Sequence, residues 1–201
     1  MGTLVIASGN PGKVREFAEL LAGLNLEVQP QPGGLEVEET GSSFAENARL
    51  KAMAVARATG QWTLADDSGL SVKALGGAPG VHSARYADSD AARIERLLQE
   101  LAAARAEALH RGEPPDDSAC FTAALAVANP AGEVVLEVEA HCPGMILEAP
   151  RGSGGFGYDP VFFVPELAQT FAEMPGELKG QIGHRGRAFT LLEPGLRQLL
   201  G

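Results

Sequence analysis

The fold class is set by residues 3–13, which read TLVIASGNPGK. Residues 3–7 are β-branched or apolar and predict a short strand, and the turn-forming residues 8–12 end it. A helix follows, because apolar residues recur at the i, i+3, i+4 and i+7 spacing of one helix face, at Val14, Phe17, Ala18 and Leu21. The opening therefore predicts a strand, a glycine-containing loop and a helix, as in α/β proteins.

The rest of the chain continues this alternation and then adds a hairpin. Further helices are predicted from Phe44 to about Gly60, from Ser89 to about Gly112, and after a loop at residues 183–186. Further strands are predicted at residues 62–65, 121–127, 134–141 and 161–164. Residues 43–46 and 170–173 both have the spacing of a helix capping box. We therefore expect an α/β fold with a mixed β-sheet and flanking helices.

Composition indicates one folded domain, or two lobes that share a core, within 201 residues. The formal net charge of −10 argues against sequence-independent binding to the phosphates of DNA or RNA. The longest apolar stretch, Ala119–Ala128, is too short to cross a membrane, and Met1–Ala7 lacks the basic residues of a signal peptide. We therefore expect a cytoplasmic protein that binds neither nucleic acid nor membrane, with Cys120 and Cys142 as reduced thiols.

The first candidate site is the loop Ser8-Gly9-Asn10-Pro11-Gly12-Lys13. A glycine-containing loop before a helix presents backbone N–H groups to an anion, and Lys13 adds a positive charge. The loop is not a Walker A motif, because the glycine spacing is too short and Val14 follows the lysine. The alternative is an ordinary turn with a solvated lysine.

The second candidate site is acidic. Glu38-Glu39 precedes the helix that begins at Phe44, and Asp66-Asp67 is expected at the end of a buried strand. Carboxylates suit Mg²⁺, which takes one or two of them together with water and substrate phosphates. Open α/β sheets bind their ligands at strand ends. The alternative is two solvated acidic turns.

Lys51 is the third candidate, because helical spacing places it on the apolar face that carries Ala48 and Val55. Asn47 flanks the same face. The alternative is a lysine whose stem packs on the core while its ammonium group reaches solvent.

The fourth candidate joins Phe156-Gly157-Tyr158-Asp159 to Lys179 and His184-Arg185. An aromatic ring can stack on a base, an aspartate can accept from a ring N–H, and lysine or arginine can donate to an exocyclic oxygen. This set suits a 6-oxo purine. The alternatives are core aromatic residues and a histidine that caps a helix or lies on the surface.

Taken together, these motifs resemble the inosine triphosphate pyrophosphatase family over residues 4–192. The matching residues occur in this order: Ser8-Gly9-Asn10 with Lys13, Glu39-Thr40-Gly41 with Phe44, Glu46-Asn47 and Lys51, Asp66-Asp67-Ser68-Gly69-Leu70, Gly76-Gly77-Ala78-Pro79-Gly80 with Ser83-Ala84-Arg85-Tyr86, Gly154 to Pro160, and His184-Arg185-Gly186. One departure is Gly183, where many relatives have serine, and it puts one hydroxyl contact in doubt.

The resemblance implies a homodimeric, Mg²⁺-dependent enzyme that hydrolyses dITP, ITP and XTP to the monophosphate and pyrophosphate. It also implies a single catalytic domain over residues 1–201, with two lobes around a central active-site cleft. Such an enzyme removes deaminated purines from the nucleotide pool.

The resemblance also implies a role for each matching residue. Ser8, Gly9, Asn10, Pro11, Gly12, Lys13 and Lys51 would contact the triphosphate, and Ser68 would contact the substrate nearby. Glu39 and Asp67 would bind the metal, with Asp67 also the general base. Phe156, Gly157, Tyr158, Asp159, Lys179, His184 and Arg185 would bind the base.

Two other functions stay open at this point. A less selective nucleotide pyrophosphatase would act on modified pyrimidines or on standard triphosphates. A nucleotide sensor would bind without hydrolysis, although a sensor has less need of both Glu39 and Asp67. The residues do not decide which of Glu38, Glu39, Asp66 and Asp67 touch the metal directly.

Overall fold

A computed structural model describes residues 2–200. Its strands are β1 (Gly2–Ala7), β2 (Leu26–Pro30), β3 (Trp62–Val72), β4 (Ser118–Ala128), β5 (Val134–Ile146), β6 (Phe162–Val164) and β7 (Gln169–Thr170). Its helices are α1 (Pro11–Leu21), α2 (Phe44–Thr59), α3 (Asp90–His110), α4 (Gly176–Ile182) and α5 (His184–Leu200), with short 3₁₀ turns at Lys73–Leu75, Gly80–Arg85 and Pro165–Leu167.

The strands form one seven-stranded sheet in the order β2-β1-β3-β4-β5-β6-β7. Strand β1 is parallel to both β2 and β3, whereas β6 is antiparallel to both β5 and β7. The prediction of a mixed sheet with flanking helices is therefore confirmed. Strand β2 was not predicted, because it is a short, half-exposed edge strand that ends at Pro30 and carries little apolar signal.

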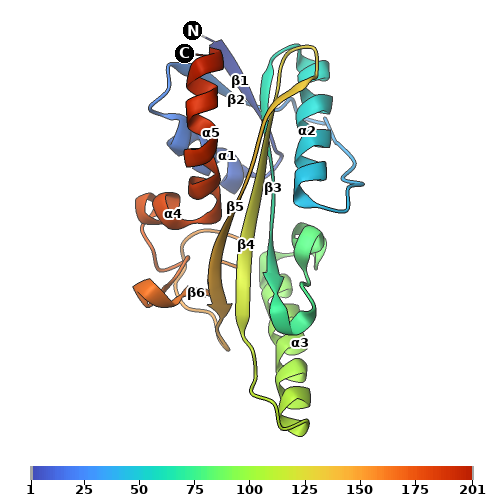
Figure 1. Cartoon of the computed structure of the whole chain (residues 1–201), viewed down its shortest axis with the longest axis vertical. Helices are drawn as coiled ribbons and strands as arrows, with labels where there is room; N and C mark the ends of the chain where they lie inside the picture. The colour runs from blue at the N-terminus through green and yellow to red at the C-terminus, as the bar shows by residue number, and fades with distance from the viewer. Residues whose placement is uncertain (1, 201) are drawn as a thin grey trace. The chain divides into compact units, whose positions relative to one another are not determined.

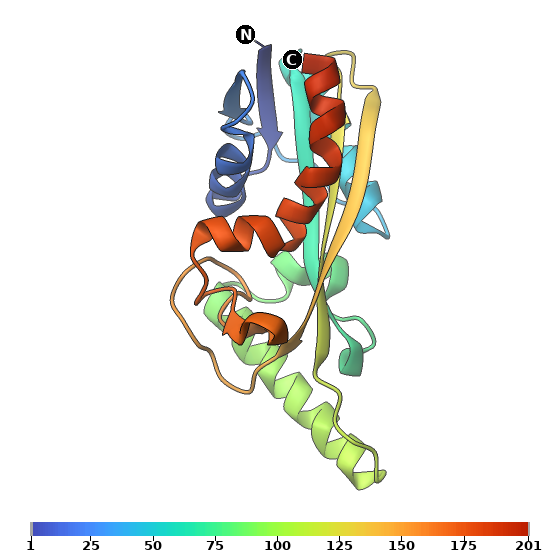
Figure 2. The same ribbon diagram turned by 60° about the vertical axis from the view of Figure 1, so that its left-hand side comes forward.

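The chain divides into two compact units. Among the described residues, unit 1 comprises 2–68, 123–140 and 184–200. In this unit α1 and α5 pack on one face of the strands through Phe17, Leu21, Phe189 and Leu192. Helix α2 packs on the other face through Ala48, Ala52 and Val55 (Figures 1 and 2). Unit 1 is thus a sheet covered on both faces, which is typical of α/β proteins.

Unit 2 comprises residues 69–122 and 141–183 and has a core of its own. Helix α3 contributes Leu97 and Leu101, which are fully buried. The rings of Phe121, Phe162 and Phe171 pack against one another with centroids 4.7 to 5.7 Å apart. These contacts support the segment that carries the predicted base-binding residues.

The expected end of β3 at Ala65 was wrong, because the strand continues to Val72. Leu70 and Val72 are fully buried and extend the inward-facing pattern beyond the acidic pair. Turn-forming residues at 66–69 indicated an end to the strand, but inside the sheet each aspartate forms an ion pair with a lysine. Asp66 and Asp67 therefore lie within a strand and not after one.

Two expectations near the C-terminal end also need correction. Residues 184–186 are not a loop, because Gly183 alone separates α4 from α5 and its N–H bonds to the carbonyl of Lys179 at 2.8 Å. The capping-box spacing at Thr170 does not begin a helix. Instead the carboxylate of Glu173 accepts the Thr170 N–H at 2.8 Å within a turn, and α4 begins at Gly176.

In residues 2–200, no helix is long and apolar enough to cross a bilayer.

Candidate active site

The loop between β1 and α1 is held by its own side chains. Ser8 Oγ accepts the Asn10 N–H at 3.1 Å. Asn10 caps α1, with its Oδ1 accepting the N–H groups of Gly12 at 2.9 Å and Lys13 at 3.2 Å. These two N–H groups are therefore engaged within the loop, and Lys13 supplies the loop's positive charge.

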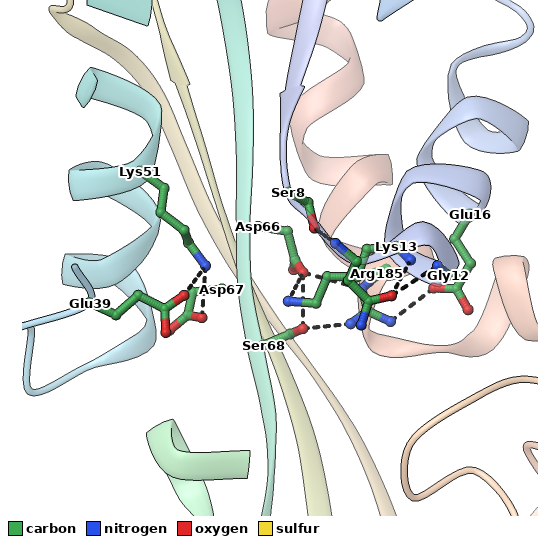
Figure 3. A network of polar contacts seen from close by, with 11 residues as sticks. Ser8, Gly12, Lys13, Glu16, Glu39, Lys51, Asp66, Asp67, Ser68 and Arg185 are labelled. Carbon is green, nitrogen blue, oxygen red and sulfur yellow. Dashed lines mark hydrogen bonds and ion pairs between the residues drawn. The ribbon is translucent and has the colours of Figure 1, made fainter. Parts of the chain in front are cut away.

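Lys13 points from α1 to Asp66 on β3, where the Nζ to Oδ2 distance is 2.8 Å (Figure 3). Arg185 Nε lies 3.3 Å from the same oxygen, and Ser68 Oγ donates to it at 3.0 Å. Arg185 also donates to Ser68 Oγ at 2.6 Å and to Glu16 at 2.9 Å. Three segments of unit 1 that are distant in sequence thus meet at one carboxylate.

The charges in this cluster shift the pKa values of its members. Burial alone would raise the pKa of Asp66, but Lys13 and Arg185 outweigh burial and hold it well below its usual range. Burial lowers the pKa of Lys13, and the attraction of Asp66 only partly offsets that effect. Asp66 is therefore a permanent anion that keeps two cations in place.

A second cluster lies on the other side of β3, because successive side chains of a strand point to opposite faces (Figure 3). Lys51 Nζ donates to Glu39 Oε1 at 2.7 Å and to Asp67 Oδ1 at 3.0 Å. The structure thus brings together Glu39, Lys51 and Asp67 from a loop, a helix and a strand. Glu38, the neighbour of Glu39 in the sequence, is exposed.

Burial raises the pKa of Asp67, although Lys51 opposes that shift. Burial alone would lower the pKa of Lys51, but Asp67 and Glu39 reverse this and raise it. A carboxyl with a raised pKa is a better proton acceptor than an ordinary aspartate, because basicity increases with pKa. The cluster therefore has the properties expected of a general base beside a cation.

The second cluster also suits a divalent cation. Lys51 neutralises only one of its two carboxylates, and Asp67 Oδ2 is buried with no hydrogen-bond partner. Within residues 2–200 there is no group of three or more His, Cys, Asp or Glu that could hold a metal alone. Magnesium ions in phosphate-handling sites need only one or two carboxylates, since substrate phosphates and water complete the shell. Glu39 and Asp67 therefore fit Mg²⁺.

The predicted base-binding residues of unit 2 gather around Asp159, which is 3% exposed. Its Oδ2 accepts from Lys179 Nζ at 2.5 Å and from the Phe156 N–H at 3.0 Å. Lys179 Nζ also lies 5.0 Å from the centre of the Phe156 ring. A Cβ at Gly155 would overlap Asp159 Oδ2, so glycine is required there by close approach as well as by its φ of +70°.

The other two residues of this segment anchor it to the rest of unit 2. Tyr158 is buried, and its hydroxyl donates to the Ser83 carbonyl at 2.9 Å. The Gly157 N–H donates to Asp90 at 2.8 Å, at the start of α3. Tyr158 therefore supports the loop from within the core.

Arg185 and His184 both begin α5 and are buried in unit 1. The sequence grouped Arg185 with the base-binding residues, but its described contacts are with the Asp66 cluster. Glu16, which binds Arg185, was not predicted as a site residue. The sequence does place Glu16 three residues after Lys13, on the same helix face, and this spacing could have indicated a site residue.

The fold and these clusters define an α/β protein with a lysine-bearing loop and a buried carboxylate pair, a combination that suits phosphate and cation binding. The profile of the Ham1 family matches residues 4–194. The chain belongs to the Ham1 family.

Individual relatives agree with this assignment. The chain is 61% identical over 197 residues to a protein of Prochlorococcus marinus named dITP/XTP pyrophosphatase, which covers 98% of this chain and 92% of the relative. It is similar to the structure of a HAM1 protein from Coxiella burnetii, with a TM-score of 0.85, 41% identity, and coverage of 98% and 100% of the two chains. The Ham1 protein of Staphylococcus aureus gives a TM-score of 0.80 at 40% identity, with coverage of 98% and 99%.

Proposed function

We propose that this chain hydrolyses non-standard purine nucleoside triphosphates, such as dITP, ITP and XTP, to the nucleoside monophosphate and pyrophosphate. The observation that carries the proposal is the close arrangement of Asp67, Lys51 and Glu39, which offers a base, a cation and a metal ligand at one place. The substrate class is supported by the relative of Prochlorococcus marinus, 61% identical, that is named dITP/XTP pyrophosphatase.

Lys13 and Lys51 bind the triphosphate in this proposal. Both ammonium groups are held by carboxylates, Lys13 by Asp66 and Lys51 by Glu39 and Asp67. Each is therefore oriented before substrate arrives, which lowers the entropy cost of binding. In the proposal Ser8 and the loop that precedes α1 contact the same phosphates as Lys13.

Asp67 orients the attacking water and takes its proton on the buried carboxylate. Attack is in line at the α-phosphorus, and pyrophosphate departs with the electron pair of the broken P–O bond. Glu39 and Asp67 would hold Mg²⁺, which when bound neutralises charge on the phosphate oxygens. Lys51 keeps the two carboxylates from repelling each other and donates to the phosphates.

Base selectivity comes from the Asp159 group. Asp159 accepts from the ring N–H of a 6-oxo purine, Lys179 donates to the 6-oxo group, and Phe156 stacks on the ring. The 6-amino group of adenine would instead meet the donors of Lys179. His184 and Arg185 complete the proposed base-binding set.

The proposal has three further parts, which the family resemblance supports. They are a single catalytic domain, a homodimeric assembly and a cytoplasmic location.

Hydrolysis in ¹⁸O-labelled water tests the reaction. Attack at the α-phosphorus places the label in the nucleoside monophosphate, which mass spectrometry detects. Label in pyrophosphate or in orthophosphate would contradict the proposal, because it would mean attack at another phosphorus.

A further inference from the structure

Asn47, the fourth residue of α2, is a polar side chain buried without any exposed surface. Its Oδ1 accepts the N–H of Gly41 at 2.8 Å, while its Nδ2 has no hydrogen-bond partner among the described residues. Its neighbours on the buried face of α2 are apolar, namely Ala48, Ala52 and Val55. A leucine of similar size would fill this space, so the contact of Oδ1 with the loop is what an amide adds here.

The loop before α2 is held against the helix by several consecutive residues. The Glu46 carboxylate accepts from the Ser42 N–H at 2.7 Å and from Ser42 Oγ at 2.9 Å. Ser43 caps the helix by accepting the Glu46 N–H at 3.2 Å. The hydrogen bond from the Gly41 N–H to Asn47 attaches the loop to α2 one residue earlier in the chain, closer to Glu39.

The approach of the loop to Asn47 is too close for any side chain at position 41. A Cβ on Gly41 would lie 2.7 Å from Asn47 Oδ1 and 2.6 Å from the Glu46 Cβ. The backbone of Gly41 therefore rests directly on the Asn47 amide. A change on either side of this contact must move the loop.

We propose that Asn47 is a positioning residue that sets the place of the Glu39 carboxylate, and through it the affinity of the site for a divalent cation. Asn47 and Lys51 are one helical turn apart on α2 and therefore face the same way. Asn47 holds the backbone of Gly41, and Lys51 holds the side chain of Glu39 at 2.7 Å, two residues earlier. One helix face thus fixes both the path of the loop and the direction of its carboxylate. The inference rests on the proposed function, since it concerns the proposed metal ligand.

The test is Mn²⁺ binding, followed by electron paramagnetic resonance, to protein saturated with α,β-methylene-ITP, whose scissile bond is blocked. Replacing a group that orients a metal ligand typically weakens metal binding by about 10- to 100-fold. We expect Asn47→Leu to weaken Mn²⁺ binding within that range. In steady-state assays we expect a higher Mg²⁺ requirement with a kcat at saturating Mg²⁺ that stays within about threefold of the unchanged protein.

Two further variants decide whether Asn47 acts through Glu39. Glu39→Gln should weaken Mn²⁺ binding, and adding Asn47→Leu to it should cause no additional loss, because the residue being positioned is already gone. Gly41→Ala should reproduce the Asn47→Leu defect from the other side of the contact. It keeps the test decisive if Asn47→Leu fails to fold by circular dichroism. Gly33→Ala is the matched control, since a Cβ there meets nothing within 4 Å.

Normal Mn²⁺ binding in both Asn47→Leu and Gly41→Ala, with weak binding in Glu39→Gln, would overturn the inference and leave the proposed metal site intact. An additional loss in the double variant would also overturn it, because Asn47 would then act independently of Glu39. Normal binding in Glu39→Gln would instead reject the proposed metal site itself.

Discussion

Lys13 Nζ lies 2.8 Å from Asp66 Oδ2, and the Asp66 side chain is only 1% exposed. Arg185 lies 3.3 Å from the same oxygen and is also buried. A buried carboxylate that holds two cations contributes strongly to the fold, because removing it leaves both cations without their shared counter-ion.

Asp66→Asn should therefore destabilise the protein by about 3–5 kcal/mol in urea unfolding followed by circular dichroism. The matched control is Glu137→Gln, which breaks the exposed pair with Arg49 and should cost less than about 1 kcal/mol. A cost for Asp66→Asn as small as that of the control would show that the cluster does not stabilise unit 1.

Asp67→Asn should lower kcat by about 100-fold or more, because the amide cannot take the proton of the attacking water. Binding of the blocked analogue α,β-methylene-ITP, measured by calorimetry, should change much less. Glu38→Gln is the control, since Glu38 is an exposed neighbour of the proposed metal ligand. Near-normal turnover in Asp67→Asn would reject the general-base role.

Gly155→Ala should reduce the preference for ITP over ATP by about ten- to a hundredfold in kcat/KM. The new methyl group displaces Asp159 and with it the hydrogen bonds to Lys179 and Phe156, and a hydrogen bond to a charged group contributes about 1.5–3 kcal/mol. Gly112→Ala carries the same left-handed strain, with a φ of +74°, but meets open space. If Gly155→Ala and Gly112→Ala had equal preference for ITP over ATP, Asp159 would have no part in base recognition.

Local signals in the sequence were sufficient to predict helix α2 and the position of Lys51 on it. Helix α2 runs from Phe44 to Thr59 as expected, and its predicted cap at Ser43 accepts the Glu46 N–H. Lys51 lies on the predicted face, with its side chain 12% exposed. These features depend on residues within one or two helical turns, where spacing alone determines which side chains meet.

The parts that could not be predicted depend on contacts between distant segments. Strand β3 continues past two aspartates because Lys13 and Lys51 neutralise them, and neither lysine is near them in sequence. The alternation of side chains along a strand predicts that Asp66 and Asp67 point in opposite directions, but the continuation of β3 to Val72 was not predicted. The pairing of Arg185 with Glu16 joins the two ends of the chain and has no local signal.

Neither tyrosine should ionise near pH 10 while the protein is folded. Burial, with the hydrogen bond to Glu100, raises the pKa of Tyr86 to about 12, and burial also raises the pKa of Tyr158. Since both folded pKa values lie above the unfolded value, the stability they confer is fully present below about pH 10 and is lost as pH rises through about 12 for Tyr86.

Absorbance at 295 nm measures this directly, because tyrosinate absorbs there and the chain contains only two tyrosines. The folded protein should show little tyrosinate at pH 10, whereas protein in urea should show half ionisation near that pH. Normal titration of both tyrosines in the folded protein would contradict the buried positions of Tyr86 and Tyr158.

The central claim is tested most directly by pyrophosphate release from ITP, XTP, dITP, GTP and ATP, each with Mg²⁺ and with EDTA. We predict rapid release from ITP, XTP and dITP with Mg²⁺, little from ATP, whose 6-amino group would meet the donors of Lys179, and none with EDTA. GTP has the same 6-oxo group and ring N–H as ITP, so its rate reports on recognition at C2 of the purine. Equal rates on all five would contradict the assignment of Asp159 and Lys179 to base recognition. Tight binding of ITP without any release of pyrophosphate would contradict the catalytic account and favour a nucleotide sensor.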